Sequence, residues 1–195
     1  MDTIKLQDLC KQFGNFKAVN DLNLSISEGT IFAFLGTNGA GKTTTIRMMS
    51  GVLEPSSGNI EICGHDIKKE AVQAKSKMGI IPDRPYIYGK LTGNEFLHFM
   101  ADLYKVEQKT TKRKISELLD LYSLERWKDD LIDSYSHGMK QRLMMCAAQV
   151  HEPKVLIVDE PMVGLDPTGA KLLKDTFREQ AARGMTIFMS THSLS

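Results

Sequence analysis

The fold is decided by Gly36-Thr37-Asn38-Gly39-Ala40-Gly41-Lys42-Thr43, a stretch that fits the pattern G-x-x-x-x-G-K-[ST] of phosphate-binding loops. The run before it, residues 30–35 (TIFAFL), is short, apolar and partly β-branched, which predicts a buried strand. Residues 44–50 after it predict a helix of two to three turns that ends at Gly51. Because strand, loop and helix agree, a chance match of glycines and a lysine is the weaker interpretation.

The chemistry of this loop follows from its residue types. Glycines let the backbone turn tightly and aim successive N–H groups inward, which forms a nest for phosphate oxygens. The helix that carries Thr44 adds the positive end of its dipole. We expect Lys42 to reach the β- and γ-phosphates of a nucleotide, and the Thr43 hydroxyl to bind Mg²⁺. The loop predicts nucleotide binding, and the rest of the chain must say what is done with the nucleotide.

Composition and charge narrow the class of protein. The 195 residues are 42% hydrophobic and 25% charged, which is ordinary for a soluble globular chain with one good-sized core. The formal net charge is +1 and no long basic block is present, so we expect no nucleic-acid partner. Cys10, Cys63 and Cys146 are scattered and odd in number, which fits a reducing cytosol and argues against a disulfide framework or a zinc site.

No segment of the sequence is suited to enter a membrane. The N-terminus lacks the apolar segment of a signal peptide, and no apolar run approaches the ~20 residues that cross a bilayer. We therefore expect a cytoplasmic protein, for which any role at a membrane requires a partner.

The hydrophobic patterns predict an α/β fold. Alternating apolar residues in 3–9 and 19–27 predict an antiparallel sheet, followed by a turn at Glu28-Gly29. The other elements predicted outside 92–150 are strands at 59–64, 78–81, 154–160 and 185–191, a short helix at 69–77, and a helix from Asp166-Pro167 to Arg183-Gly184. Two prolines within 82–86 make the chain leave the sheet there.

Residues 92–150 predict helices only. Thr92-x-x-Glu95 is a capping box that opens the first helix. Apolar residues then recur at helical spacing in three segments: Phe96, Leu97, Met100, Leu103 and Tyr104; Ile115, Leu118, Leu119 and Tyr122; Met139, Leu143, Ala147 and Val150. We predict a single domain in which 1–90 and 152–195 form the core with its N-terminal antiparallel β-subdomain, and 91–151 form an inserted helical subdomain.

Asp159 and Glu160 end a predicted buried strand and complement the loop. The strand ends of a parallel sheet line one crevice, so we expect Asp159 to face Mg²⁺ held near Thr43. Glu160 is placed to polarise a water for attack on the γ-phosphate. Such a pair alone is usually a solvated strand end, but with the loop upstream it predicts nucleotide hydrolysis. The expected fold is a P-loop nucleoside triphosphatase core with a mainly parallel sheet.

With these residues in place, the chain resembles the ATP-binding subunits of ATP-binding cassette (ABC) transporters over essentially its whole length. Gly36–Thr43 matches the Walker A motif of that family, and Val155–Glu160 matches Walker B with its catalytic glutamate. Residues 135–139 (YSHGM) align with the family signature, typically Leu-Ser-Gly-Gly-Gln. Gly164-Leu165-Asp166 resembles the D-loop.

The resemblance also implies roles for three single residues. Phe13 stands at the position of the adenine-stacking aromatic, usually Tyr, although on its own it predicts only a core or loop aromatic. His192 resembles the switch histidine that contacts the γ-phosphate, whereas a lone histidine at a strand end is more often structural. Asp83 stands where the Q-loop usually has Gln. It can still accept a hydrogen bond from a Mg²⁺-bound water, but with more negative charge and a shorter reach.

The signature implies a site shared between two chains. Ser136, His137, Gly138 and Met139 begin a predicted helix, a second anion-binding end, although alone Ser136 is equally an ordinary helix cap. In the family this end closes on the ATP of another subunit, so that two chains sandwich two ATP molecules head to tail. His137 and Met139 replace the usual Gly and Gln, while Ser136 and Gly138 keep the helix-end chemistry.

The function that the resemblance implies is an ATP-hydrolysing subunit, with ATP and Mg²⁺, that powers transport of an unknown substrate, more in the manner of exporters than of importers. The implied partners are a second ATP-binding subunit, in a homo- or heterodimer, and membrane-spanning permease subunits. These would hold the chain at the cytoplasmic face of a membrane, with Tyr86, Tyr88 and Leu91 as candidate contacts.

Two alternatives stay open. A soluble ABC ATPase that acts on DNA or ribosomes is disfavoured by the single Walker A motif and by the compact spacing from Lys42 to Asp159, which leaves no room for a long coiled coil. An inactive, C-terminally short cassette is suggested by Asp83 and by the end of the chain three residues after His192, where family members usually continue.

Overall fold

The structure is a computed structural model of the chain, and it describes residues 1–83, 86–163 and 165–192. These residues divide into two compact units: a core unit (1–83, 154–161 and 177–192) and a helical unit (86–153, 162–163 and 165–176). The predicted boundaries of the core and the helical subdomain stay a prediction. Of the predicted exit from the sheet at 82–86, Arg84 and Pro85 lie outside the described residues.

The core unit opens with the predicted antiparallel sheet, in the strand order β2-β1-β4-β5. Its strands are β1 (Asp2–Phe13), β2 (Phe16–Ser27), β4 (Ser57–Ile62) and β5 (His65–Asp66). The first two are longer than the predicted strands 3–9 and 19–27, because they continue as a hairpin to a tight turn at Gly14-Asn15. The hairpin tip pairs Phe13 with Phe16.

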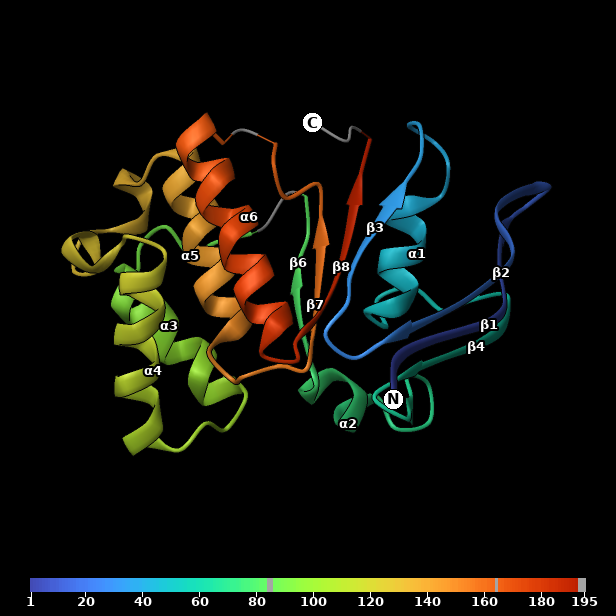
Figure 1. The fold of residues 1–195 in the computed structure, drawn as a ribbon, viewed down its shortest axis with the longest axis horizontal. Coiled ribbons are helices and arrows are strands. Elements are labelled where there is room, and N and C mark those ends of the chain that lie inside the picture. Colours follow the sequence, from blue (N-terminus) through green and yellow to red (C-terminus); the bar gives the residue numbers. More distant parts are fainter. Residues whose placement is uncertain (84–85, 164, 193–195) are drawn as a thin grey trace. The chain divides into compact units, whose positions relative to one another are not determined.

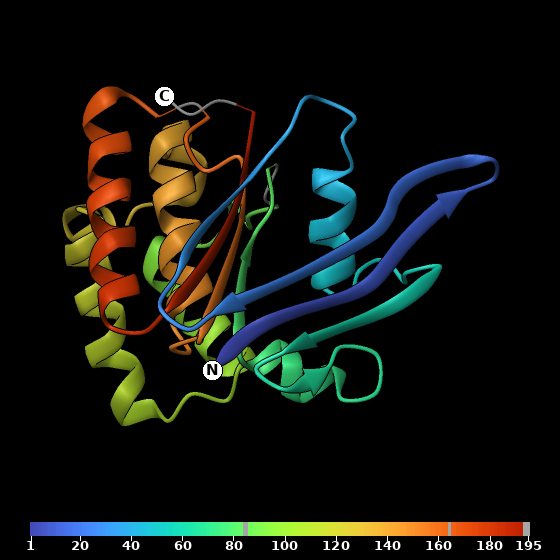
Figure 2. The same ribbon diagram turned by 45° about the vertical axis from the view of Figure 1, so that its right-hand side comes forward.

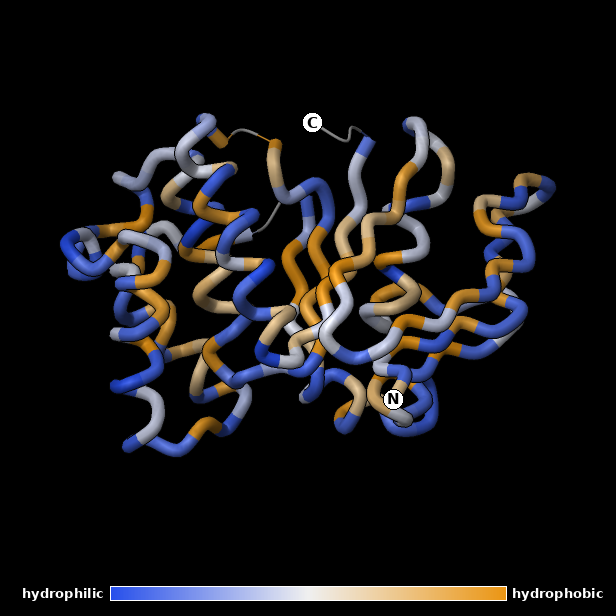
Figure 3. Tube along the Cα trace, viewed as in Figure 1, coloured by the Kyte–Doolittle hydropathy of each residue, from blue (hydrophilic) through white to orange (hydrophobic). Residues whose placement is uncertain are grey.

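The second sheet of the core unit is parallel, in the order β3-β8-β7-β6, which confirms the predicted mainly parallel sheet. Its strands are β3 (Ile31–Leu35), β6 (Met78–Ile81), β7 (Val155–Asp159) and β8 (Thr186–Thr191). Every residue of β7 is buried, as expected for a strand with neighbours on both sides, and Figure 3 shows its hydrophobic colouring.

The strand predicted at 30–35 is present as β3, but the prediction that it is buried is wrong. Four residues of β3 are only half-buried, and Leu35 is exposed. The physical reason is position in the sheet, because β3 is the outermost strand on its side among those that the structure describes. An apolar run predicts a strand but does not distinguish an outer strand from a central one.

The hydrophobic core of this unit holds the phosphate-binding loop in place through helix α1 (Lys42–Met49). Figures 1 and 2 show α1 between the antiparallel and the parallel sheet. Its buried Met48 belongs to one cluster with Ile4 and Ile60 of the first sheet and with Val155 and Phe188 of the second. A shift of α1 would disturb both interfaces. The short helix α2 (Ala71–Ser76) precedes β6, as predicted.

The helical unit contains α3 (Gly93–Leu103), α4 (Gln108–Leu121) and α5 (His137–Gln149), with short 3₁₀ turns at Glu125–Trp127 and Ile132–Ser134. The predicted capping box is confirmed: the Thr92 hydroxyl accepts from the Glu95 N–H, and the Glu95 carboxylate accepts from the Thr92 N–H. The final long helix, α6 (Pro167–Ala182), begins with residues of the helical unit and ends with residues of the core unit.

The predicted apolar faces of these helices are largely buried, with one exception. Phe96, Leu97 and Tyr122 are buried as expected. Leu103, which has the same helical spacing, is 60% exposed. It is the last residue of α3, where the helix ends and no further turn covers it. Within the described ranges, no helix combines the length and the apolar character needed to span a membrane.

Candidate nucleotide site

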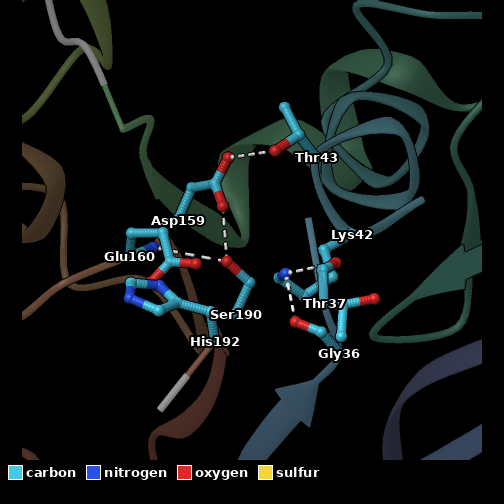
Figure 4. Close-up of polar contacts among 8 residues, drawn as sticks. All are labelled: Gly36, Thr37, Lys42, Thr43, Asp159, Glu160, Ser190 and His192. Carbon is cyan, nitrogen blue, oxygen red and sulfur yellow. Dashed lines mark hydrogen bonds and ion pairs between the residues drawn. The ribbon is translucent and has the colours of Figure 1, made fainter. Parts of the chain in front are cut away.

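The candidate site lies in the core unit, at one edge of the parallel sheet. The phosphate-binding loop follows β3, Asp159 is the last residue of β7, and His192 follows β8 directly. Because β3, β8 and β7 run parallel, these three features leave the sheet at the same edge. Figure 4 shows their side chains grouped together.

The loop depends on one glycine for its shape. Gly41 has a φ of +86°, in the left-handed region that side chains avoid. A Cβ at this position would lie 2.3 Å from the backbone oxygen of Ala18 in β2, a distance that no carbon can occupy. Gly41 is also the N-cap of α1 and offers no side-chain cap, so the first N–H groups of the helix are left for an anion.

Lys42 lies inside the loop. Its side chain is 7% exposed, and its Nζ donates to the carbonyl oxygens of Gly36 (2.6 Å) and Thr37 (3.1 Å), as Figure 4 shows. The remaining loop residues Asn38, Gly39 and Ala40 are exposed, with one turn closed by the Ala40 N–H donating to the Thr37 carbonyl (3.2 Å). The buried ammonium of Lys42 therefore gives the loop a positive charge, while residues 38–40 of the loop are exposed.

Thr43 and Asp159 meet although 116 positions separate them. The Thr43 Oγ1 donates to Asp159 Oδ2 at 3.0 Å. Asp159 is only 4% exposed, and its other oxygen, Oδ1, accepts from the hydroxyl of Ser190 on β8. A hydroxyl and a carboxylate therefore face each other at the edge of the sheet, as the sequence predicted for a metal-binding pair.

Glu160 and His192 form a second pair. Glu160 Oε2 lies 3.0 Å from His192 Nδ1, with the Glu160 side chain 16% exposed and the His192 side chain 55% exposed. Glu160 has a φ of +49°, in the left-handed region that is unfavourable for a residue with a side chain. Its N–H donates to the Ser190 carbonyl at 3.2 Å, which ties the turn to β8.

Two further predicted residues belong to the core unit. Phe13 ends β1 with 49% of its surface exposed, and the Lys11 ammonium lies 5.2 Å from its ring centre. This exposed ring is compatible with stacking on a base, and the role stays a prediction. Asp83 lies two residues beyond the end of β6 and is exposed. Its role as a metal contact also stays a prediction.

The signature and D-loop residues lie in the helical unit, where both are helix caps. Ser136 is the N-cap of α5, and its hydroxyl accepts from the Met139 N–H at 3.3 Å. His137 is exposed and Gly138 half-exposed, so the start of α5 is open to solvent. Asp166 precedes α6, and its Oδ1 accepts from the Gly169 N–H at 2.9 Å. Gly164 of the predicted D-loop lies outside the described residues.

Sequence reasoning missed Ser190. It is fully buried, and it contacts both acids at the end of β7. A signal was available: Ser190 is a polar residue near the end of a buried strand, two positions before His192. What the sequence lacked was the register, which pairs Asp159 with Ser190 across two strands that helix α6 separates in the chain.

A phosphate-binding loop before a helix, with acids at the end of another parallel strand of the same sheet, defines a P-loop nucleotide-binding fold. The ABC transporter family profile matches residues 19–163, and this chain belongs to that family. It is 42% identical over 193 residues to the bacitracin transport ATP-binding protein BcrA of Bacillus licheniformis, covering 98% of this chain and 62% of BcrA.

Two further comparisons agree with this family. The linearmycin resistance ATP-binding protein LnrL of Bacillus subtilis (strain 168) is 36% identical, over 97% of this chain and 61% of LnrL. A solved structure of the ATP-binding subunit of an ABC transporter superposes with a TM-score of 0.91 at 33% identity, covering 98% of this chain and 80% of that one. The chain thus spans about three fifths of the length of these curated relatives.

Proposed function

We propose that this chain is the ATP-binding and ATP-hydrolysing part of a transporter, and that it powers export of a substrate through separate membrane-spanning subunits. The observation that carries the proposal is the pair of Thr43 with Asp159, with Glu160 as the next residue, beside a phosphate-binding loop. Members of this family hydrolyse ATP. Relatives named for bacitracin transport and linearmycin resistance support export, because resistance by transport requires outward movement.

In this proposal the core unit holds the nucleotide with three kinds of group. The loop N–H groups and the start of α1 bind the phosphate oxygens. The ammonium of Lys42 leaves the carbonyls of Gly36 and Thr37 and supplies positive charge to the β- and γ-phosphates. The exposed ring of Phe13 stacks on the adenine.

The residues present also fit Mg²⁺. This ion prefers hard oxygen ligands and is usually held by one or two protein groups together with substrate phosphates. The Thr43 hydroxyl and Asp159 Oδ2, 3.0 Å apart, are such a pair, with Asp83 as a further candidate. No cluster of three or more acidic, histidine or cysteine ligands occurs among the described residues, so an all-protein cage for a different metal is not indicated there. When bound, Mg²⁺ neutralises charge that develops on the phosphates.

Hydrolysis in this proposal is the work of Glu160 and His192. Glu160 accepts a proton from a water whose oxygen attacks the γ-phosphorus, while the bond to the ADP oxygen breaks. His192, 3.0 Å from Glu160, donates to a γ-phosphate oxygen and orients it. The two side chains are already neighbours, so Glu160 and His192 need not be brought together from a distance.

We further propose that two chains complete each site. The N-terminal end of α5, with Ser136 as its cap and Gly138 in its first turn, has the backbone geometry to bind the phosphate of an ATP held by a second copy. The expected sign is an ATPase rate per chain that rises with protein concentration until dimers saturate. A rate per chain that stays constant on dilution would contradict the shared site.

A surface of the helical unit suits the membrane-spanning partner. Tyr86 is 83% exposed, Tyr88 48% and Phe99 40%, and the ring of Tyr88 contacts both others edge to face at 5.6 and 5.7 Å. A contiguous exposed aromatic cluster of this kind favours a protein contact. In this proposal it receives the membrane subunit and so places the chain at the cytoplasmic face of the membrane.

The test of the proposed activity is ATP turnover with Mg²⁺, measured as phosphate release. Glu160→Gln keeps the size of the side chain but removes the base, so we expect the rate to fall by a factor of ~10² to 10⁴. The matched control is Glu179→Gln, since Glu179 is an exposed carboxylate paired only at the surface with Arg183. Absent wild-type turnover, or equal rates in wild type and Glu160→Gln, would overturn the assignment.

A further inference from the structure

One buried hydroxyl in the core unit contacts both acids of the site. Ser190 lies in β8 with 0% of its surface exposed, and its partner across the parallel ladder is Asp159. Burying a hydroxyl is unfavourable unless its hydrogen bonds are made. The groups that hydrogen-bond to Ser190 therefore indicate which role its hydroxyl has in the site.

The hydrogen bonds of Ser190 have a fixed direction. An ionised carboxylate only accepts, so the Ser190 hydroxyl must donate its single proton to Asp159 Oδ1. Its lone pairs then accept from the Glu160 N–H at 3.3 Å, and the Ser190 carbonyl accepts from the same N–H at 3.2 Å. One residue thereby holds the carboxylate of Asp159 and the backbone of Glu160 (Figure 4).

This arrangement determines which oxygen of Asp159 faces the threonine. With Oδ1 bound to Ser190, Oδ2 is the oxygen turned towards Thr43, at 3.0 Å from its hydroxyl. Without the Ser190 hydroxyl, Oδ1 would be a buried acceptor lacking this donor, and the carboxylate would lose one of the two hydrogen bonds that orient it. Outer groups that orient a metal ligand in this way affect metal affinity by ~10- to 100-fold when removed.

We propose that Ser190 is a positioning residue for Mg²⁺. Its hydroxyl fixes the Asp159 carboxylate so that Oδ2 faces Thr43. Its hydrogen bond with the Glu160 N–H fixes the backbone from which the Glu160 side chain extends. The inference rests on the proposed ATP site and deepens it. It predicts a residue that affects how strongly Mg²⁺ is held but not how the phosphate-binding loop binds nucleotide without metal.

The same strand provides a matched control. Thr186 also lies in β8, is 0% exposed and has a buried hydroxyl, which bonds to the Thr3 hydroxyl at 2.8 Å. It pairs with Val155 at the opposite end of β7, away from the two acids. Thr186→Val therefore removes a buried hydroxyl from β8 without touching the site.

The experiment measures binding of a fluorescent ATP analogue in EDTA and then across a Mg²⁺ titration. We expect Ser190→Ala to leave the affinity for the analogue in EDTA unchanged. The Mg²⁺ concentration that gives half of the metal-dependent change in analogue binding should rise by ~10-fold or more. Ser190→Thr keeps the hydroxyl and should restore the wild-type value, and Ser190→Cys, with a weaker donor, should lie between. Thr186→Val should match wild type.

The outcomes separate the two proposals. Wild-type protein that binds no nucleotide would overturn the proposed function and this inference with it. If wild type binds and Ser190→Ala shows the wild-type Mg²⁺ dependence, or loses metal-free binding as well, only the positioning role is overturned. An equal Mg²⁺ shift in Thr186→Val would have the same meaning. If Ser190→Ala does not fold, the comparison of Ser190→Cys with Thr186→Val decides.

Discussion

Replacing Gly41 by alanine places a methyl group where the structure has no room. The new Cβ would lie 2.3 Å from the Ala18 carbonyl oxygen and 3.3 Å from Val19 Cγ2. Since such contacts do not fall below 3.0 Å, the loop or strand β2 must move by about 0.7 Å, the difference between these distances. The first neighbour is backbone in a paired strand, so it cannot move aside by a rotamer change.

Two penalties add up for this substitution. A residue with a side chain at φ +86° costs about 1–2 kcal/mol. Overpacking against a fixed neighbour costs a further 1–3 kcal/mol or so, for a total loss of about 2–5 kcal/mol in the free energy of unfolding. Gly64→Ala is the matched control, because Gly64 has a φ of +81° but nothing within 4 Å of its Cβ position. It should show only the first penalty.

The assay is urea unfolding followed by circular dichroism, together with binding of a fluorescent ATP analogue. Gly41→Ala should lose more stability than Gly64→Ala and should weaken nucleotide binding by ~100-fold, because a displacement near 1 Å at a preorganised site has that scale of effect. Gly64→Ala should bind like wild type. Equal stability losses in the two variants, or undiminished binding in Gly41→Ala, would refute the reasoning.

Three further variants test other contacts. Thr92→Ala removes the side-chain half of the capping box of α3 and should cost ~1 kcal/mol in urea unfolding, while the backbone N–H of residue 92 still donates to Glu95. Hydrogen bonds from the Thr92 backbone and side chain lower the pKa of Glu95, and the variant loses the second of them. That part of the stabilisation is complete above the ordinary pKa of 4.5 and is lost as the pH falls through the lowered one; a difference that grows in acid would contradict it. Phe13→Ala should raise the Kd for ATP ~10-fold while Phe13→Tyr does not, and equal affinities would exclude stacking. Tyr122→Phe removes the buried acceptor of the Gln149 amide (2.6 Å) and should cost about 1–3 kcal/mol in unfolding, whereas unchanged stability would show that the amide finds another partner.

The sequence predicted best where local chemistry alone determines the structure. The phosphate-binding loop is flanked by a strand and a helix as expected, and Met78–Ile81 is a strand with the predicted bounds. The capping box of α3 forms because its two hydrogen bonds join residues only three positions apart. The meeting of Thr43 with Asp159 was also predictable, because the ends of parallel strands converge at one edge.

What the sequence could not supply is the lateral order of the strands. An apolar run such as TIFAFL has the same composition whether it is central or outermost, so the burial of β3 was overestimated. Leu103 fits the helical period of α3 but is its last residue. At a helix end the period no longer predicts that a side chain is buried. The contact of Ser190 with Asp159 depends on which strands are neighbours, and no local pattern contains that information.

The position of β8 has a consequence for how the protein is made. In the order β3-β8-β7-β6, strand β8 follows the other three in the sequence and yet lies between β3 and β7. During synthesis β3 and β7 therefore emerge without the neighbour that joins them, and the gap between them stays open until residues 186–191 arrive. Until β8 is in place, the edges of β3 and β7 that it joins lack their partner, and an unpaired strand edge can pair with another chain.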